Sequence, residues 1–147
     1  MNKLILFDLN GTIIYRSKNS KKVYIRSHLE EFKEFPLIGI YSSMPFRNIV
    51  KIIPKLPINI SVVFDRSFTS PDTERFKTIR NLDLIMKSEF IKNHGIKKEN
   101  IIIIDNEPRK VRYCKENAII IPEFDVKNKD DIELIKLKNN LKGTFTI

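Results

Sequence analysis

Short apolar runs alternate with longer segments of mixed polarity along most of this 147-residue chain. The runs are rich in Ile, Val and Leu and show no polar alternation, which is typical of strands buried on both faces of a parallel sheet. They cover residues 3–7, 36–41, 61–64, 101–105 and 118–122. Because segments with helical spacing separate several of them, the pattern predicts an α/β sandwich with right-handed crossovers.

The segments between the runs carry signals for helix ends. Ser27 and Glu30 lie three positions apart, a capping-box pattern that predicts a helix over 27–35. A stretch ending near Gly95 predicts another helix, over about 79–93, with the glycine as its C-cap. The other expected helices cover 44–53, a stretch beginning near Pro108, and 130–141.

Residues 12–26 break this alternation. TIIYR and KVYIR are two β-like runs around the polar turn SKNSK, which predicts a β-hairpin directly after Asp8. Such a hairpin would stand as a flap over the carboxyl ends of the parallel strands, where open α/β sheets bind ligands.

Composition narrows the class of protein. Hydrophobic residues make up 41% and charged residues 31% of the chain, the balance of a globular protein, and the length predicts a single domain over 1–147. No apolar run approaches the roughly 20 residues of a membrane span, so no membrane association is expected. The chain enters a strand-like segment at once, which argues against a cleaved signal peptide. The single cysteine, Cys114, excludes an internal disulfide framework and favours a cytoplasmic or nuclear, reducing compartment.

The formal net charge of +9 has two interpretations. It could attract polyanions such as nucleic acid, phosphoproteins or acidic peptides. It could equally reflect composition, because Ile, Lys and Asn are abundant and the lysines are scattered along the chain. The two interpretations are compatible, and the sequence does not separate them.

Polar side chains suited to phosphate chemistry stand at the ends of three expected strands. Asp8 follows the first, Ser42 and Ser43 follow the second, and Asp105 and Asn106 close the fourth. In a parallel sheet these groups converge at one edge. There an aspartate can attack a phosphoryl group, Mg²⁺ can offset the repulsion, and hydroxyls can bind the phosphoryl oxygens. The order of these groups along the chain is stronger evidence than any one of them.

FDLNGTI resembles the first motif, DxDGT, of the haloacid dehalogenase superfamily. Four further stretches make the resemblance narrower: IRSHLEEF, IYSSMP, IIIIDNEP and KENAIIIPEF are similar to segments of the small RNA polymerase II C-terminal-domain phosphatases, also called NLI-interacting-factor-like. Their joint order, together with the closing NKDDIELIKLKNNL, extends the resemblance over about residues 3 to 142. It implies a three-layer, Rossmann-like sandwich without a large cap domain.

The resemblance also implies roles for individual residues. Asp8 would be the nucleophile and a metal ligand, Asn10 would offer its backbone carbonyl to Mg²⁺, and Thr12 would fix the loop. Asn106 would complete the metal shell with Asp105 in support.

The same resemblance assigns the phosphate contacts. Ser42 or Ser43 would hold the phosphate, although a strict alignment places Tyr41 at the usual threonine. Lys77 would neutralise the phosphoryl group and the aspartyl-phosphate, and Arg80 is close enough in sequence to compete for that role.

Asn10 departs from the family pattern, in which an aspartate protonates the leaving oxygen and then deprotonates the hydrolytic water. An amide cannot shuttle a proton, and loss of a general acid/base typically lowers the rate about 10²–10⁴-fold. The chain could be a slow enzyme, a pseudophosphatase that binds phosphorylated ligands, or a protein whose native aspartate was replaced.

The resulting hypothesis is a Mg²⁺-dependent phosphomonoester phosphatase acting on phosphoserine or phosphothreonine in proteins. The second hypothesis is an inactive phosphopeptide-binding or scaffold module. A nucleic-acid end phosphatase, suggested by the net charge, is the third and is not favoured.

Overall fold

The computed structural model describes residues 3–17, 19, 21–72 and 77–142, with Lys77 described by its backbone alone. Five parallel strands form one sheet in the order β5-β4-β1-β8-β9. Their bounds are β1 Leu4–Phe7, β4 Ile38–Tyr41, β5 Val62–Phe64, β8 Ile101–Asp105 and β9 Ala118–Ile120. The five apolar runs are therefore the five strands, and the predicted parallel sheet is confirmed.

The central strand β1 is buried on both faces. Ile5 and Phe7 belong to one hydrophobic cluster and Leu4 and Leu6 to a second, and all four side chains are 0% exposed. This division follows from the two-residue period of a strand, which sends successive side chains to opposite faces.

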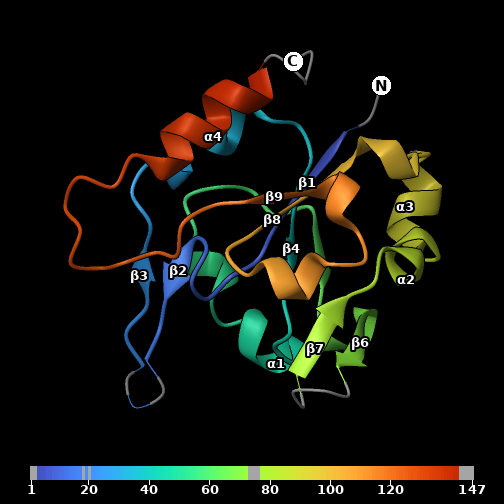
Figure 1. Ribbon diagram of the computed structural model, residues 1–147, viewed down its shortest axis with the longest axis horizontal. Coiled ribbons are helices and arrows are strands. Elements are labelled where there is room, and N and C mark those ends of the chain that lie inside the picture. Colours follow the sequence, from blue (N-terminus) through green and yellow to red (C-terminus); the bar gives the residue numbers. More distant parts are fainter. Residues whose placement is uncertain (1–2, 18, 20, 73–76, 143–147) are drawn as a thin grey trace.

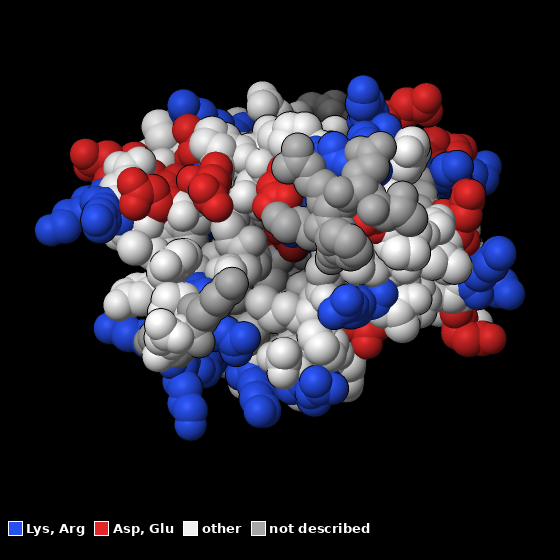
Figure 2. Space-filling view, turned by 60° about the horizontal axis from the view of Figure 1, so that its bottom comes forward, with Lys and Arg blue, Asp and Glu red and all other residues white. Residues whose placement is uncertain are grey.

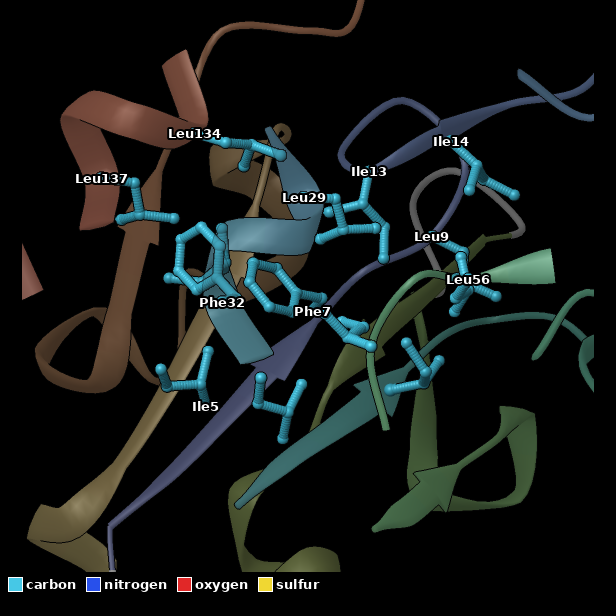
Figure 3. Packing of buried hydrophobic residues seen from close by; sticks show 14 of the residues in the cluster. Ile5, Phe7, Leu9, Ile13, Ile14, Leu29, Phe32, Leu56, Leu134 and Leu137 are labelled. Carbon is cyan, nitrogen blue, oxygen red and sulfur yellow. The ribbon is translucent and has the colours of Figure 1, made fainter. Parts of the chain in front are cut away.

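Helical layers cover both faces of the sheet (Figure 1). On one face lie α4 (Glu133–Lys142), the 3₁₀ helix η1 (Leu29–Glu34) and α1 (Phe46–Ile49). Figure 3 shows Leu134 and Leu137 of α4 near Phe32, whose ring packs edge-on against Phe7 at a centroid distance of 5.2 Å. On the other face lie α2 (Leu82–Met86) and α3 (Glu89–His94). The predicted three-layer, Rossmann-like sandwich is confirmed.

Two antiparallel hairpins stand apart from the sheet, at the end of the molecule away from the two termini (Figure 1). The first pairs β2 (Ile14–Tyr15) with β3 (Tyr24–Ile25) and confirms the predicted flap. The second pairs β6 (Thr69–Asp72) with β7 (Lys77–Arg80) and was not predicted. The buried carboxylate of Asp72 forms ion pairs with Arg109 Nε at 3.0 Å and Arg112 Nη2 at 3.3 Å. These ion pairs connect the hairpin to the segment after β8. No large cap domain occurs among the described residues.

The prediction of one helix over 79–93 is wrong, because the segment begins as a strand and then forms two helices. Ile79 and Arg80 belong to β7, and Asn81 then caps α2 by accepting the N–H of Leu84 at 3.3 Å. Ser88 caps α3 in the same way, so two capping side chains divide the segment into two short helices. Gly95, with φ of 59°, ends α3 as the predicted C-cap.

Two other helix predictions also need correction. The capping box at Ser27 is absent, because His28 adopts a left-handed backbone (φ 74°) and the 3₁₀ helix η1 begins only at Leu29. The helix expected over 44–53 is interrupted: α1 covers only Phe46–Ile49, and Ile53 belongs to the 3₁₀ helix η2, where Pro54 has no N–H for an α-helical hydrogen bond. The remaining 3₁₀ helices are η2 Ile53–Lys55, η3 Arg66–Phe68, η4 Lys98–Asn100, η5 Pro108–Val111 and η6 Lys115–Asn117.

None of the helices in the described part of the chain combines the length and the apolar character that crossing a membrane requires.

Candidate active site

Two buried carboxylates and one buried guanidinium meet at the carboxyl ends of the central strands. Asp8 follows β1, Asp105 ends β8, and Arg80 ends β7. Arg80 Nη2 lies 2.8 Å from Asp8 Oδ1 and 3.4 Å from Asp105 Oδ2, and the three side chains are at most 4% exposed. The strand order reverses between β1 and β8, so this cluster lies at the point where open α/β sheets bind ligands.

The loop after β1 contacts the loop after β8 directly. The hydroxyl of Thr12 lies 3.1 Å from Asp8 Oδ2 and 3.1 Å from Asn106 Oδ1, so one side chain fixes both groups. Gly11 makes this approach feasible. Its φ is 90°, and a Cβ at this position would lie 2.9 Å from Asn106 Nδ2. A side chain here would strain the backbone and displace Asn106.

Asp105 is fixed by hydrogen bonds from its own loop, and its pKa is raised. Its Oδ1 accepts the N–H groups of Asn106 at 2.8 Å and Glu107 at 3.0 Å, whereas its Oδ2 has no aligned hydrogen bond from a described residue. Burial and then the charge of Asp8 raise the pKa of Asp105 to about 6, against the opposing effect of Arg80. An additional positive charge at this edge would therefore be stabilised by Asp105.

The two serines after β4 make different contacts. Ser43 Oγ accepts Arg80 Nη1 at 2.8 Å and the hydroxyl of Thr78 at 2.6 Å, so it belongs to the same hydrogen-bonded group as Asp8. Ser42 is buried, and its Oγ accepts the backbone N–H of Met44 at 3.1 Å. No described residue accepts the Ser42 hydroxyl proton, and no hydrogen bond among the described residues joins Ser42 to Asp8 or Arg80.

Tyr41 packs against the guanidinium of Arg80. Its ring lies 5.0 Å from the guanidinium carbon of Arg80, within the range of a cation–π contact. Its hydroxyl accepts the N–H of Asn81 at 2.7 Å and donates to the carbonyl of Phe68. Burial raises the pKa of Tyr41 to about 12, so the phenol stays neutral. Tyr41 therefore positions Arg80 and makes no described contact with Asp8.

Asn10 lies at the exposed rim of this cluster. Its amide oxygen accepts the backbone N–H of Arg16 at 2.9 Å, which joins the loop after β1 to the β2–β3 hairpin. A carboxylate could accept the same hydrogen bond with one oxygen and keep the other oxygen free. The position thus has room for the aspartate of the family pattern without a change in the loop.

The predicted cation Lys77 begins β7, and its side chain lies outside the described part of the chain. Arg80, named above as the competing residue, pairs with both carboxylates. Its Nε has no hydrogen-bond partner among the described groups, so the guanidinium is anchored through its two Nη atoms.

Sequence reasoning missed Arg26, which braces the loop after β1. Arg26 is 2% exposed, and its Nε donates to Asp131 Oδ2 at 2.8 Å. Its Nη1 donates to the carbonyls of Thr12 at 2.9 Å and Pro122 at 2.8 Å. The available signal was an arginine directly after the β-like run KVYI, at the end of the predicted hairpin.

The donors at this edge suit a hard cation. Carboxylate oxygens of Asp8 and Asp105 and the amide oxygen of Asn106 face the same small region, and the buried Asp105 Oδ2 accepts no hydrogen bond from the described groups. Such oxygen donors are those that Mg²⁺ prefers. The described residues hold no group of three or more His, Cys, Asp or Glu arranged for a metal. A metal here would therefore depend on the Asn106 amide and a backbone carbonyl as well as carboxylates.

Comparison with known protein families identifies the family of this chain. The family model described as NLI interacting factor-like phosphatase matches residues 3–146, nearly the whole chain. A comparison with curated protein sequences found no match.

Proposed function

The chain belongs to the family of NLI interacting factor-like phosphatases, and on that premise we propose that it hydrolyses phosphomonoesters through an aspartyl-phosphate on Asp8. The observation that carries the proposal is the buried guanidinium of Arg80 between Asp8 and Asp105 at an open sheet edge. A carboxylate held beside a fixed positive charge can receive a phosphoryl group whose own charge that cation then offsets.

Asp8 is the nucleophile in this proposal. Its two oxygens are oriented by different partners, Oδ1 by Arg80 and Oδ2 by Thr12. Such orientation lowers the entropy cost of reaching the attack geometry. The P–O bond forms at Asp8 as the bond to the leaving hydroxyl breaks, and water then cleaves the aspartyl-phosphate to release inorganic phosphate.

Arg80 and the two serines would bind the phosphoryl oxygens. Arg80 reaches Asp8 and Ser43 with different Nη atoms, so its fork can bridge the nucleophile and a bound phosphate. Ser42 adds a hydroxyl proton without a described acceptor. Arg80 thus takes the role that the sequence offered first to Lys77.

Asp8, Asp105, Asn106 and the backbone carbonyl of Asn10 would hold Mg²⁺. When bound, the ion would offset the repulsion between the carboxylate and the incoming phosphate. The pKa of Asp105, about 6, reflects the unfavourable burial of its negative charge. The positive charge of the ion would stabilise the ionised carboxylate.

The substrate class follows from the open site. No cap covers the cluster among the described residues, so a small molecule would remain exposed to water at this edge. A phosphoserine or phosphothreonine in a polypeptide brings its own surface to close the site. We therefore assign a phosphoprotein as the substrate.

Asn10 limits turnover in this proposal, because its amide cannot protonate the leaving oxygen or activate water. The test is Mg²⁺-dependent hydrolysis of an aryl phosphate and a phosphoserine peptide by the chain and by Asn10→Asp. We expect the carboxylate to raise the rate about 10²–10⁴-fold. Adding Asp8→Asn to that variant should abolish the gain.

Asn93→Asp is the matched control, since Asn93 makes the same amide-to-acid change at an exposed position of α3. It should leave the rate at the parental value. If Asn10→Asp hydrolyses neither substrate faster than Asn93→Asp, the chain is not a latent phosphatase.

The second candidate function is a phosphopeptide-binding module, and the presence of Asn10 is the observation that favours it. In that case the chain binds a phosphoserine peptide without turnover. Tight binding that survives Asn10→Asp with no hydrolysis would identify this alternative.

A further inference from the structure

A basic groove lies beside the candidate active site. It is a recess of about 600 Å³ between the β2–β3 hairpin and the segment after α1. Its walls carry four cations, Arg16, Lys21, Lys51 and Lys55, above apolar atoms of Val23 and Ile52. Figure 2 shows Lys and Arg side chains gathered at the lower left of this face, whereas most Asp and Glu side chains in view lie higher up.

Within the described part of the chain, no carboxylate neutralises the four cations named above. None of them forms an ion pair with a carboxylate of the described residues, and no carboxylate lines the recess there. Some lysines elsewhere are neutralised, such as Lys138, whose Nζ lies 2.9 Å from Glu34 Oε1. Four like charges around one recess produce a positive potential that attracts anions.

The groove begins where the candidate active site ends. The backbone N–H of Arg16 donates to Asn10 Oδ1, and Asn10 follows the proposed nucleophile Asp8 by two residues. A polypeptide whose phosphoserine sits at Asp8 can therefore lay neighbouring residues along the hairpin. The recess has the volume of a site for a few side chains.

We propose that this groove binds acidic or phosphorylated residues that flank the target phosphoserine, so that the substrate is an acidic phosphopolypeptide. The inference rests on the proposed phosphatase function and adds to it a preference for sequence context. Flanking carboxylates or phosphates supply the anions, and the aliphatic stems of their side chains cover the half-buried Val23.

The composition of the groove favours a polypeptide over single-stranded nucleic acid. Bases bind such grooves largely by stacking on aromatic rings, and no aromatic residue lines this one among the described residues. Tyr15 and Tyr24 pair across the hairpin, but they alternate with Arg16 and Val23 and so project from its opposite face.

Fluorescence anisotropy on the full chain with Mg²⁺ tests the proposal. The probes are a phosphoserine peptide with glutamates on both sides, the same peptide with glutamines, the glutamate peptide without phosphate, and a 5′-phosphorylated oligonucleotide. The groove variant is Lys51→Glu with Lys55→Glu. The matched control is Lys92→Glu with Lys97→Glu, which makes the same charge change at exposed lysines outside the groove. Circular dichroism confirms that both variants are folded.

At low salt we expect the glutamate phosphopeptide to bind about tenfold more tightly than the glutamine phosphopeptide. The groove variant should erase this difference, and the control should keep it. Equal binding of the two phosphopeptides, no binding of any peptide, equal losses in both variants, or tighter binding of the oligonucleotide would each overturn the proposal. Failure of the phosphatase function is a separate result, read from hydrolysis: the Asn10→Asp variant would then release no phosphate from the glutamate phosphopeptide, whatever the groove variant does to binding.

Discussion

Replacing Arg80 with methionine tests the central arrangement of the site. Methionine keeps a long, flexible apolar side chain at a position that is 0% exposed, but it removes the positive charge between Asp8 and Asp105. It also removes the hydrogen bond to Ser43 and the contact with the ring of Tyr41. The two carboxylates are then left buried without their cation.

The size of the effect follows from these contacts. Removing one partner of a buried ion pair typically costs about 3–5 kcal/mol, because a charge is left uncompensated. At about 2–4 °C per kcal/mol for a domain of this size, the melting temperature should fall by about 10 °C at pH 7. The loss should be smaller at pH 5, since Asp105, whose pKa is already raised to about 6, can then take up a proton. If Arg80 stabilises the transferring phosphoryl group as proposed, removing its charge should lower kcat about 10²–10³-fold.

The assay measures melting temperature and aryl phosphate hydrolysis in the Asn10→Asp background, where turnover is large enough to follow. Arg80→Lys should recover part of the activity, because it restores the charge without the fork geometry. Arg47→Met is the matched control, since Arg47 is exposed on α1 and makes no described ion pair. Lys77→Met separates the two candidate cations.

The assignment of Arg80 is refuted if Arg80→Met keeps full activity and melts like the control. It is also refuted if Lys77→Met removes activity while Arg80→Met does not. In that case Lys77 carries the phosphate charge, and Arg80 only neutralises a buried pair of carboxylates.

Three further changes test the loops around this cluster. In metal-free buffer the free energy of unfolding should fall as pH rises from about 4 to about 6. The cause is Asp105, which keeps its proton in the folded state up to a pKa of about 6 but releases it near 3.8 in the unfolded state. Denaturant titrations at several pH values measure this slope, and Asp105→Asn should remove it. Gly11→Ala should cost about 1–3 kcal/mol, since φ is 90° and the new Cβ would collide with Asn106; unchanged thermal melting would contradict the tight contact between the loops. Arg26→Met should cost about 3–5 kcal/mol, because the buried Asp131 carboxylate loses its counter-ion. It should also lower activity, because the Thr12 carbonyl loses a buried donor; calorimetry and the phosphatase assay measure the two losses.

The sheet could be predicted from sequence because its signal is local. A strand buried on both faces needs an unbroken apolar run, and each of the five runs is such a strand. The groups attached to strand ends follow from the same reasoning, so Asp8 and Asp105 were expected at one edge. Their contact through Arg80 confirms that they meet there.

The second hairpin could not be predicted, and it changed the identity of the cation near Asp8. A helix starting at residue 79 would have left Arg80 on a helical surface, whereas β7 directs it between the carboxylates. The pairing of β6 with β7 depends on partners distant in sequence, such as Arg109 and Arg112 on Asp72. Local propensity carries no information about such partners.

Arg26 has a consequence for synthesis of the chain. The carbonyl of Thr12, within the loop that carries Asp8, is held by a guanidinium whose counter-ion is Asp131, more than a hundred positions later. Until that carboxylate leaves the ribosome, Arg26 would be a desolvated and unbalanced charge, and the loop would lack its brace. A nascent chain therefore gains a braced Asp8 loop only after Asp131 has been synthesised, and products that stop before Asp131 would lack the brace.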